Sequence, residues 1–437
     1  MQLLNQIRDL DFPANLPKTL LTIQQTFDRR QVEDVAAATR QALQQSGFLT
    51  RVQPGQSVAI GVGSRGITHL ATIVKTTVDY LHELKSLPFI FPSMGSHAGA
   101  TAEGQRQMLI NLGVDPAVVG AEIRATMEIV RIGQVPAGPE LYQDALAAQA
   151  DHTLLINRIK PHTSFRSHIE SGLAKMCAIG MGKQPGAALF HSLGVEGLRH
   201  FLAPAARIYE ANTNLIGGLA ILENAYHQTA EIVGLSPAEI GADREAELLI
   251  KARGLMASLP FAAIDVLVVK QLGKNISGTG LDTNVINRLK IPRQPEPADA
   301  PDIAVIAVLD LTEETHGNAN GLGLANVTTA RVAAKIDFEA MYTNAISSGI
   351  LGMWRAHLPL TMADDRRALQ VALRGCAQPP EAARMVFIQD TLSLDEFYVS
   401  PSLRPAVEAQ PRLSITGEIG LSFDQKGAMM TPWRFSS

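Results

Sequence analysis

The sequence predicts an α/β protein of two domains, each with a mostly parallel sheet. The chain has 437 residues, which is too long for one typical domain of about 100–200 residues. Apolar, strand-like runs alternate with segments of helical periodicity over residues 57–159 and again in the last third of the chain. This alternation is typical of parallel sheets covered by helices. We place the domains at residues 1–259 and 260–437, with the boundary beside Pro260.

In the first domain, strands are expected where short apolar runs end at glycine or proline, and helices where apolar residues recur at helical spacing. The expected strands are Ser57–Gly63, Pro88–Gly95, Ile129–Gly133 and Thr153–Ile159, and the expected helices are Ala71–Lys85, Thr101–Val114 and Pro237–Met256. Ser236 is the expected N-cap of the last helix, because a serine hydroxyl there accepts a backbone N–H bond.

The second domain repeats this pattern. The expected strands are Val266–Lys270 and Ile303–Leu309, and the expected helices are Leu324–Lys335, Phe338–Ile346 and Ala363–Leu373. The proline-rich stretch Pro292–Pro301 is expected to be an exposed loop.

The composition predicts a soluble cytoplasmic protein. The net charge is −4 with mixed signs, no dense Lys/Arg run is present, and aromatic residues make up 5% of the chain, which argues against a nucleic-acid partner. Two cysteines, Cys177 and Cys376, suit a reducing compartment. No apolar stretch reaches the roughly 18–20 residues of a membrane helix, and the N-terminus does not resemble a signal peptide.

Polar residues follow three of the expected strands. Ser64 and Arg65 come after the first, His97 after the second, and His162 after the fourth. Sites in parallel sheets lie at the carboxyl ends of the strands, so these side chains are expected at one edge. Two histidines there are suited to proton transfer from opposite sides of a substrate, because the histidine pKa lies near 6.5. His168 is a further candidate for the second of these roles.

The segment from residue 162 to 191 combines a lysine, histidines and glycines. Lys175 ends the small-residue run Ser171–Lys175. Small neighbours admit a bulky planar group, and a lysine amine shielded from water becomes nucleophilic. His191 alone would not hold a metal tightly, but it could complete the coordination of a metal already held by a cofactor. The glycine-rich run Gly180–Gly186 lies between them and resembles an anion cradle.

Other polar residues are candidates for substrate contacts. The guanidinium of Arg65 offers a fork for a carboxylate. Asn287 and Lys290 are three residues apart and would share a face at the start of a helix. The polar loop that contains His316 follows an expected strand and is a candidate contribution from the second domain.

Taken together, these motifs resemble the nickel-pincer-dependent lactate racemase family, and the match is closer to its broad group of other members than to lactate racemase itself. The matching residues occur in the family's order over nearly the whole chain. They are Ser64-Arg65, Gly95-Ser96-His97, Pro161-His162, Ser171-Gly172 with Lys175, His191, and Asp282 with Asn287 and Lys290.

The resemblance implies a two-domain α/β isomerase with its active site in the interdomain cleft. It also implies a nickel-pincer nucleotide, a pyridinium mononucleotide with two thiocarboxyl arms that grip nickel. The roles that it implies are covalent attachment at Lys175, nickel ligation by His191, paired acid/base action by His97 and His162, substrate orientation by Arg65, Asn287 and Lys290, and cofactor contacts from Ser171, Gly172, Gly180 and Gly182. The expected partners are a small 2-hydroxy acid and the cofactor-making proteins; a homo-oligomer stays open, and a protein made without that pathway is expected to lack the cofactor.

The sequence departs from lactate racemase in the region assigned to the substrate. Val62 stands where that enzyme has an acidic residue. The gap between His162 and Lys175 is longer, which makes His168 and Arg166 further candidates for the site. Arg166 and Glu170 would suit a more polar substrate such as a sugar acid. The alternatives are a nicotinamide-dependent oxidoreductase, for which no dinucleotide fingerprint is present, and a non-catalytic nickel- or cofactor-binding protein.

Overall fold

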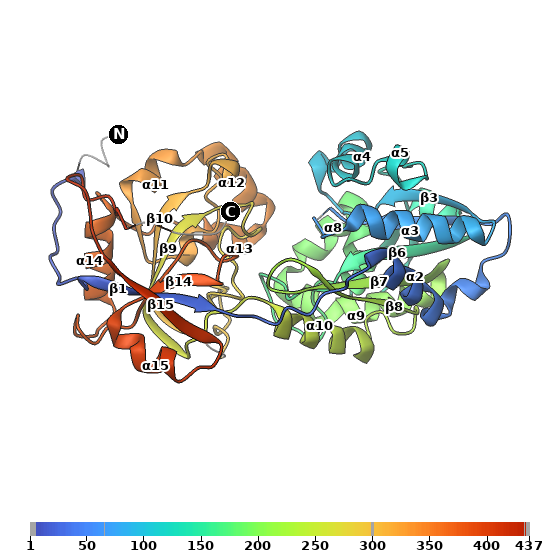
Figure 1. Cartoon of the computed structure of the whole chain (residues 1–437). Coiled ribbons are helices and arrows are strands. Elements are labelled where there is room, and N and C mark those ends of the chain that lie inside the picture. Colours follow the sequence, from blue (N-terminus) through green and yellow to red (C-terminus); the bar gives the residue numbers. More distant parts are fainter. Residues whose placement is uncertain (1–5, 65, 299–300, 432, 434–437) are drawn as a thin grey trace. The chain divides into compact units, whose positions relative to one another are not determined.

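The structure is a computed structural model of the chain and describes residues 6–64, 66–298, 301–431 and 433. It contains two compact units, each with a sheet and flanking helices (Figure 1). The continuous unit is Asp28–Met256, and the split unit combines Met1–Phe27 with Ala257–Ser437. The expected class, two α/β domains with mostly parallel sheets, is confirmed. The division differs from 1–259 and 260–437 at the N-terminus, where β1 (Thr19–Gln25) pairs with two strands near the end of the chain.

The continuous unit is built on a five-stranded sheet in the order β3-β2-β6-β7-β8. Its strands are β2 (Ser57–Val62), β3 (Leu87–Pro92), β6 (His152–Arg158), β7 (Leu215–Glu223) and β8 (Thr229–Leu235). The first four in spatial order are parallel, and β8 is antiparallel to β7. The strands read as continuous apolar runs because both faces of the sheet are covered, and β2 is buried at every position after Ser57.

The helices of this unit lie before, between and after its strands in the chain. They are α2 (Val35–Ser46), α3 (Leu70–Glu83), α4 (Ala102–Asn111), α5 (Pro116–Val119), α6 (Ala145–Gln149), α7 (Leu173–Lys175), α8 (Lys183–Ser192), α9 (Gly194–Asn212) and α10 (Asp243–Leu255), with 3-10 turns at Phe48–Arg51 and Ala98–Ala100 and a π-helical turn at Met176–Gly180. Helix α4 begins where expected, because the Thr101 side chain accepts the Gly104 N–H at 3.1 Å.

Two expectations for this unit are wrong in detail. Residues 129–133 do form a strand, but β4 (Ile129–Gln134) pairs antiparallel with β5 (Glu140–Asp144) in a separate hairpin. The helix expected from Pro237 begins at Asp243. The Ser236 hydroxyl donates to the Glu239 carboxylate at 2.7 Å and closes a turn there, so it does not cap the helix.

The split unit contains an eight-stranded sheet in the order β12-β11-β10-β9-β13-β14-β1-β15. The strands beyond β1 are β9 (Ala263–Leu272), β10 (Asp302–Leu311), β11 (Val327–Thr329), β12 (Leu360–Met362), β13 (Met385–Ile388), β14 (Glu396–Val399) and β15 (Leu413–Gly420). The strands from β12 to β13 are parallel, and β14, β1 and β15 extend the sheet in antiparallel fashion.

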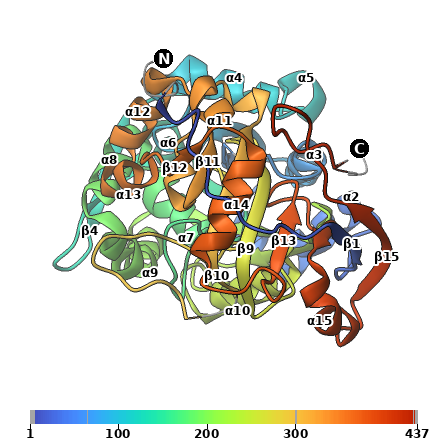
Figure 2. The ribbon, with the colours of Figure 1, turned by 90° about the vertical axis from the view of Figure 1, so that its left-hand side faces the viewer.

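Helices pack on both faces of the parallel part of this sheet. The helices of the unit are α11 (Ala330–Lys335), α12 (Phe338–Ser347), α13 (Gly349–Arg355), α14 (Asp365–Gly375) and α15 (Arg404–Glu408), the last of which lies against β15, with 3-10 turns at Glu313–Thr315, Leu322–Leu324 and Pro401–Leu403. Helix α14 lies across β9 and β10 (Figure 2). The first part of the helix expected at residues 324–335 is instead the short strand β11, and the proline-rich stretch 292–301 includes residues 299 and 300, which lie outside the described residues.

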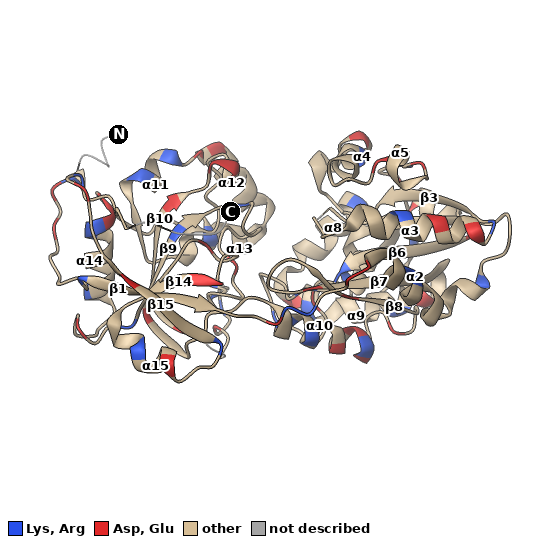
Figure 3. Cartoon of the chain, in the orientation of Figure 1, with Lys and Arg blue, Asp and Glu red and all other residues tan. Residues whose placement is uncertain are grey.

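Charged residues of both signs are interspersed over the helices of both units (Figure 3). In the described part of the chain, no helix has the length and apolar character needed to cross a membrane.

Candidate functional site

The candidate site lies at the carboxyl edge of the sheet in the continuous unit. Strand β2 lies between β3 and β6, and all three are parallel. Ser64, His97 and His162 follow the ends of these three neighbouring strands, as expected. The Ser64 hydroxyl forms a hydrogen bond with Nδ1 of His97, which joins the β2 and β3 ends directly.

The loop that carries His97 has an unusual backbone. His97 itself is exposed, and it precedes a 3-10 turn in which Ala98 and Ala100 have φ angles of 54° and 52°. Residues with a Cβ rarely adopt this left-handed conformation, and such strain persists where surrounding contacts fix it. Here the buried Gln105 amide donates to the carbonyl oxygens of Gly95 at 2.8 Å and His97 at 3.3 Å.

The ring of His162 is held from two sides. Its Nδ1 accepts the N–H of Ser164 at 3.0 Å, and its ring contacts Phe165 with 4.5 Å between ring centroids. Because Nδ1 is an acceptor, the neutral ring carries its proton on Nε2. The contacts therefore fix both the orientation and the tautomer of this histidine.

Glu170 organises the loop between His162 and the next segment. Its side chain is completely buried and accepts the backbone N–H groups of His162 at 2.6 Å and Ser167 at 2.9 Å. Arg253 forms an ion pair with it at 2.7 Å. Burial raises the pKa of Glu170, and these N–H groups and Arg253 act against that rise. Glu170 therefore supports the loop from inside, and the expectation that it contributes to a polar substrate pocket is wrong.

The two other polar residues of this loop lie in different surroundings. The half-buried Arg166 folds back on its own loop and donates to the carbonyl oxygens of His162 at 2.8 Å and Phe165 at 3.3 Å. His168 is exposed, and its Nε2 lies 3.4 Å from a carboxylate oxygen of the exposed Asp243. Of the two candidate histidines, His162 is the one that directly follows the end of β6.

The segment that carries Lys175 is bonded to the same edge at three points. The Asn157 side chain at the end of β6 donates to the carbonyl of Gly172 at 2.9 Å. Lys160 and Ser171 exchange backbone hydrogen bonds at 3.0 and 3.3 Å. The Gly95 N–H in the His97 loop donates to the carbonyl of Gly180 at 3.1 Å. The expected lysine segment and the expected acid/base loops are thus brought together.

The glycines of this segment permit close packing within the protein itself. An added Cβ on Gly172 would collide with the carboxylate of Glu245, which accepts the N–H groups of Gly241 at 2.7 Å and Ala174 at 3.2 Å. A Cβ on Gly180 would lie 2.7 Å from the carbonyl oxygen of Ser93, and one on Gly182 would lie 3.1 Å from Gly186 Cα. Internal packing therefore accounts for the glycines at residues 172, 180 and 182.

Lys175 and His191 act on each other electrostatically. Lys175 is half-buried at the end of α7, and His191 lies in the last turn of α8. Partial desolvation of the ring and the positive charge of Lys175 lower the pKa of His191, although the residue as a whole remains exposed. The neutral imidazole, which is the metal-binding form, is therefore favoured at neutral pH. Over the described ranges, no group of three or more His, Cys, Asp or Glu residues could hold a metal ion.

The predicted residues of the split unit lie on loops after β9 and β10. Asn287, Lys290 and His316 all have left-handed φ angles, of 47°, 52° and 46°. The Lys290 amine donates to the carbonyl of Gly323 at 2.6 Å, and Glu296 accepts the Lys290 backbone N–H at 2.6 Å. Residues 283–287 form turns and residues 288–290 have no regular structure, so Asn287 and Lys290 do not share a helix face as expected. Arg65 lies outside the described residues.

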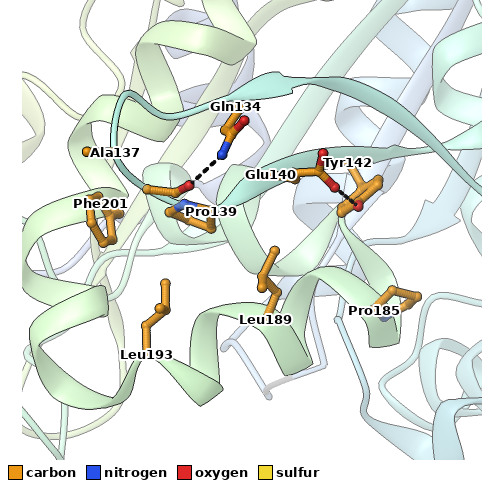
Figure 4. A pocket seen from close by; sticks show the side chains of 10 residues that line it. Gln134, Ala137, Pro139, Glu140, Tyr142, Pro185, Leu189, Leu193 and Phe201 are labelled. Carbon is orange, nitrogen blue, oxygen red and sulfur yellow. Dashed lines mark hydrogen bonds between the residues drawn. The ribbon is translucent and has the colours of Figure 1, made fainter.

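A separate pocket of about 490 Å³ lies between the β4–β5 hairpin and helices α8 and α9 (Figure 4). Leu189 of α8, Leu193 between the two helices and Phe201 of α9 contribute apolar side chains to one wall. Glu140 and Tyr142 stand on the hairpin side, where the tyrosine hydroxyl donates to the carboxylate at 2.5 Å. The sequence-predicted site residues are not among those that line this pocket.

Sequence reasoning missed the buried residues that support the site. Glu245 binds the start of α7 from 71 residues away, and Gln105 binds the His97 loop from α4. Neither lies in a motif, so local patterns gave no signal. Ser64 was named as part of a motif, but its contact with His97 follows from strand order, which the sequence does not specify.

No protein-family model matches this chain, and no curated protein matches it. Among solved structures, the chain is similar to the lactate racemase apoprotein from Thermoanaerobacterium thermosaccharolyticum, with 12% identity, coverage of 86% of this chain and 90% of that chain, and a TM-score of 0.44. It is also similar to a protein from Thermotoga maritima, with 12% identity, coverage of 65% of this chain and 72% of that chain, and a TM-score of 0.45.

Proposed function

We propose that this protein is an isomerase that inverts a 2-hydroxy acid with the help of a nickel-pincer nucleotide attached at Lys175. The family motifs, in the family's order, are the basis in sequence. The observation that supports it most is the convergence of the His97 loop, the His162 loop and the Lys175 segment at one sheet edge.

The chemistry of Lys175 and His191 supports the proposal of such a group. Lys175 would hold it through its amine, and His191 would provide the protein's ligand to nickel. The lowered pKa of His191 favours the neutral ring that ligation requires. When bound, the group would supply the acceptor and donor of the substrate hydride.

The two histidines differ in what their hydrogen bonds allow. The Ser64 hydroxyl can donate or accept, so Nε2 of His97 is able to present a lone pair and take the hydroxyl proton of the substrate. His162 receives the Ser164 N–H on Nδ1 and presents an N–H on Nε2. We therefore assign proton removal to His97 and orientation of the substrate oxygen to His162. For inversion of the opposite enantiomer, His162 would have to accept the proton on Nε2. It would then carry its own proton on Nδ1, so the hydrogen bond from the Ser164 N–H would first have to break.

The family motifs assign Arg65, Lys290 and Asn287 to the substrate carboxylate. We propose that they provide cationic and amide donors, which match a carboxylate. His316 and Arg166 are further candidates. The side chains of Arg166 and Lys290 each donate to a backbone carbonyl oxygen of their own unit and would exchange that bond for the substrate. We propose a 2-hydroxy acid as the substrate class, with aldonates included because the loop around His162 differs from lactate racemase.

The test is a stereochemical screen of protein that was co-expressed with the cofactor-making enzymes. Purified enantiomers of 2-hydroxy acids and aldonates are incubated with it, and inversion is followed by chiral chromatography. The proposal expects inversion of at least one acid, and loss of inversion in His97→Gln. Stoichiometric reduction of added NAD would favour the oxidoreductase alternative. A cofactor-loaded protein that inverts none of the acids would overturn the proposed reaction.

A further inference from the structure

A buried ion pair lies at the start of helix α8, the helix that carries His191. Lys183 opens helix α8, and its amine lies 2.8 Å from a carboxylate oxygen of Asp144. Both side chains have an exposed fraction of 0%. Removing two charges from water is costly, and breaking such a pair on one side is more costly still. A pair of this kind at the surface of a helix end would be unremarkable, but complete burial calls for a physical reason.

The remaining contacts of the Lys183 amine lead to the His97 loop. The amine donates to the carbonyl oxygen of Pro92 at 2.6 Å and to the Gln105 side-chain oxygen at 3.3 Å. The opposite end of the Gln105 amide donates to the Gly95 and His97 carbonyl oxygens. Gln105 is itself fully buried, so its orientation is set by Lys183 on one side and by the loop on the other.

The backbone at Lys183 is consistent with this constraint. Its φ angle is 51°, in the left-handed region that a lysine rarely adopts. Strain of this kind persists where side-chain contacts determine the conformation. Asp144 is fixed in turn, because its other carboxylate oxygen accepts the N–H groups of Leu146 at 2.8 Å and Ala147 at 3.0 Å at the start of α6.

We infer that Lys183 is a positioning residue that fixes the loop bearing His97 relative to helix α8, which bears His191. Gln105 transmits this constraint to the loop, and Asp144 balances the buried charge. The functional meaning of the inference rests on the proposed roles of His97 and His191. The claim that Lys183 and Gln105 fix the position of the His97 loop can be tested on the protein without cofactor.

The test compares two variants that interrupt the chain of contacts at different points. Gln105→Leu removes the link to the His97 loop and keeps the ion pair. Lys183→Met combined with Asp144→Asn removes both charges together, and asparagine can still cap α6. Lys251→Met is the matched control, because it removes a partly exposed lysine paired with Glu231 in the same unit.

The first readout is NMR of histidine-labelled apo protein, with the resonances assigned through His97→Gln and His191→Gln. Gln105→Leu is expected to shift or broaden the His97 ring signal alone, and the double variant should change both His97 and His191. Folded variants that keep both signals at their wild-type positions overturn the inference. If the double variant does not fold, Gln105→Leu, or the smaller change Gln105→Asn, decides the question.

The second readout is inversion by the loaded enzyme. Displacement of a reacting group by about 1 Å can cost on the order of 100-fold in rate, so Gln105→Leu should lower kcat by roughly 10- to 100-fold while KM changes little. Wild-type protein without any inversion would defeat the proposed function, and the NMR result would still decide the positioning role. Unchanged kcat together with unchanged histidine signals would refute that role.

Discussion

The collision expected at Gly172 gives a quantitative test of how the lysine segment is held. Gly172→Ala adds a methyl group that would overlap Glu245 Oε1 and lie 3.2 Å from its Cδ and 3.3 Å from Ile159 Cγ1. The φ angle of Gly172 is 175°, which alanine adopts freely, so the entire cost is steric.

The expected loss of stability in Gly172→Ala follows from the two ways in which the structure can relieve the overlap with Glu245. If the backbone shifts, overpacking costs about 1–3 kcal/mol. If Glu245 moves away, the N–H groups of Gly241 and Ala174 lose their acceptor, at about 1–3 kcal/mol for each buried group. We therefore expect a loss of about 2–3 kcal/mol in the free energy of unfolding, or roughly 5–10 °C in melting temperature for a unit of this size.

Thermal and urea unfolding of apo protein measure this loss. Gly254→Ala is the matched control, since it lies in α10 with nothing within 4 Å of an added Cβ and should be neutral or stabilising by up to about 1 kcal/mol. Glu245→Asp should recover part of the loss in Gly172→Ala, because the shorter carboxylate withdraws. Gly172→Ala protein as stable as the wild type would refute the reasoning.

Three further predictions concern the charges and ligands of the site. Burial raises the pKa of Glu170, so its stabilising contribution is present at acidic pH and is lost as pH rises through the folded-state pKa. In urea unfolding from about pH 4 to about pH 8, the stability of the wild type relative to Glu170→Gln should therefore fall as pH rises. A stability difference that increases with pH would contradict this. His191→Ala should keep a covalent adduct at Lys175 but lower the nickel-to-protein ratio in metal analysis, whereas unchanged nickel would exclude His191 as a ligand. Lys290→Met should keep adduct and nickel and reduce kcat/KM by on the order of 10- to 100-fold in the inversion assay, as expected for loss of a charged hydrogen bond to a substrate; an unchanged kcat/KM would remove Lys290 from the site.

Local sequence patterns were sufficient to predict the strands that position the site. Strands β2, β3 and β6 are buried on both faces, so each reads as an apolar run that ends where a polar residue begins. Parallel strands place those ends at one edge, and this is why His97 and His162 could be expected near each other from the sequence.

Contacts between distant residues could not be predicted in this way. β1 pairs with β14 and β15 from the opposite end of the chain, and an isolated seven-residue strand does not reveal its partners. The same holds for the hairpin of β4 and β5, since an apolar run does not specify parallel or antiparallel pairing.

The hydrogen-bond and ion-pair partners of buried polar residues could not be predicted from the sequence either. The sequence suggested that Glu170 contributes to a polar substrate pocket, because it lies in the longer gap between His162 and Lys175 where the chain departs from lactate racemase. In the structure, two backbone N–H groups and Arg253 compensate for its burial. A compensation of this kind depends on residues 3 to 83 positions away, which no local pattern describes.

Intact mass and nickel content of protein co-expressed with the cofactor-making enzymes test the central claim most directly. We expect wild-type protein to gain the mass of the nucleotide group together with nickel, Lys175→Ala to gain no covalent mass, and Lys251→Met to behave as the wild type. A wild-type protein that gains neither mass nor nickel, or a Lys175→Ala variant that gains the same mass, would contradict the account.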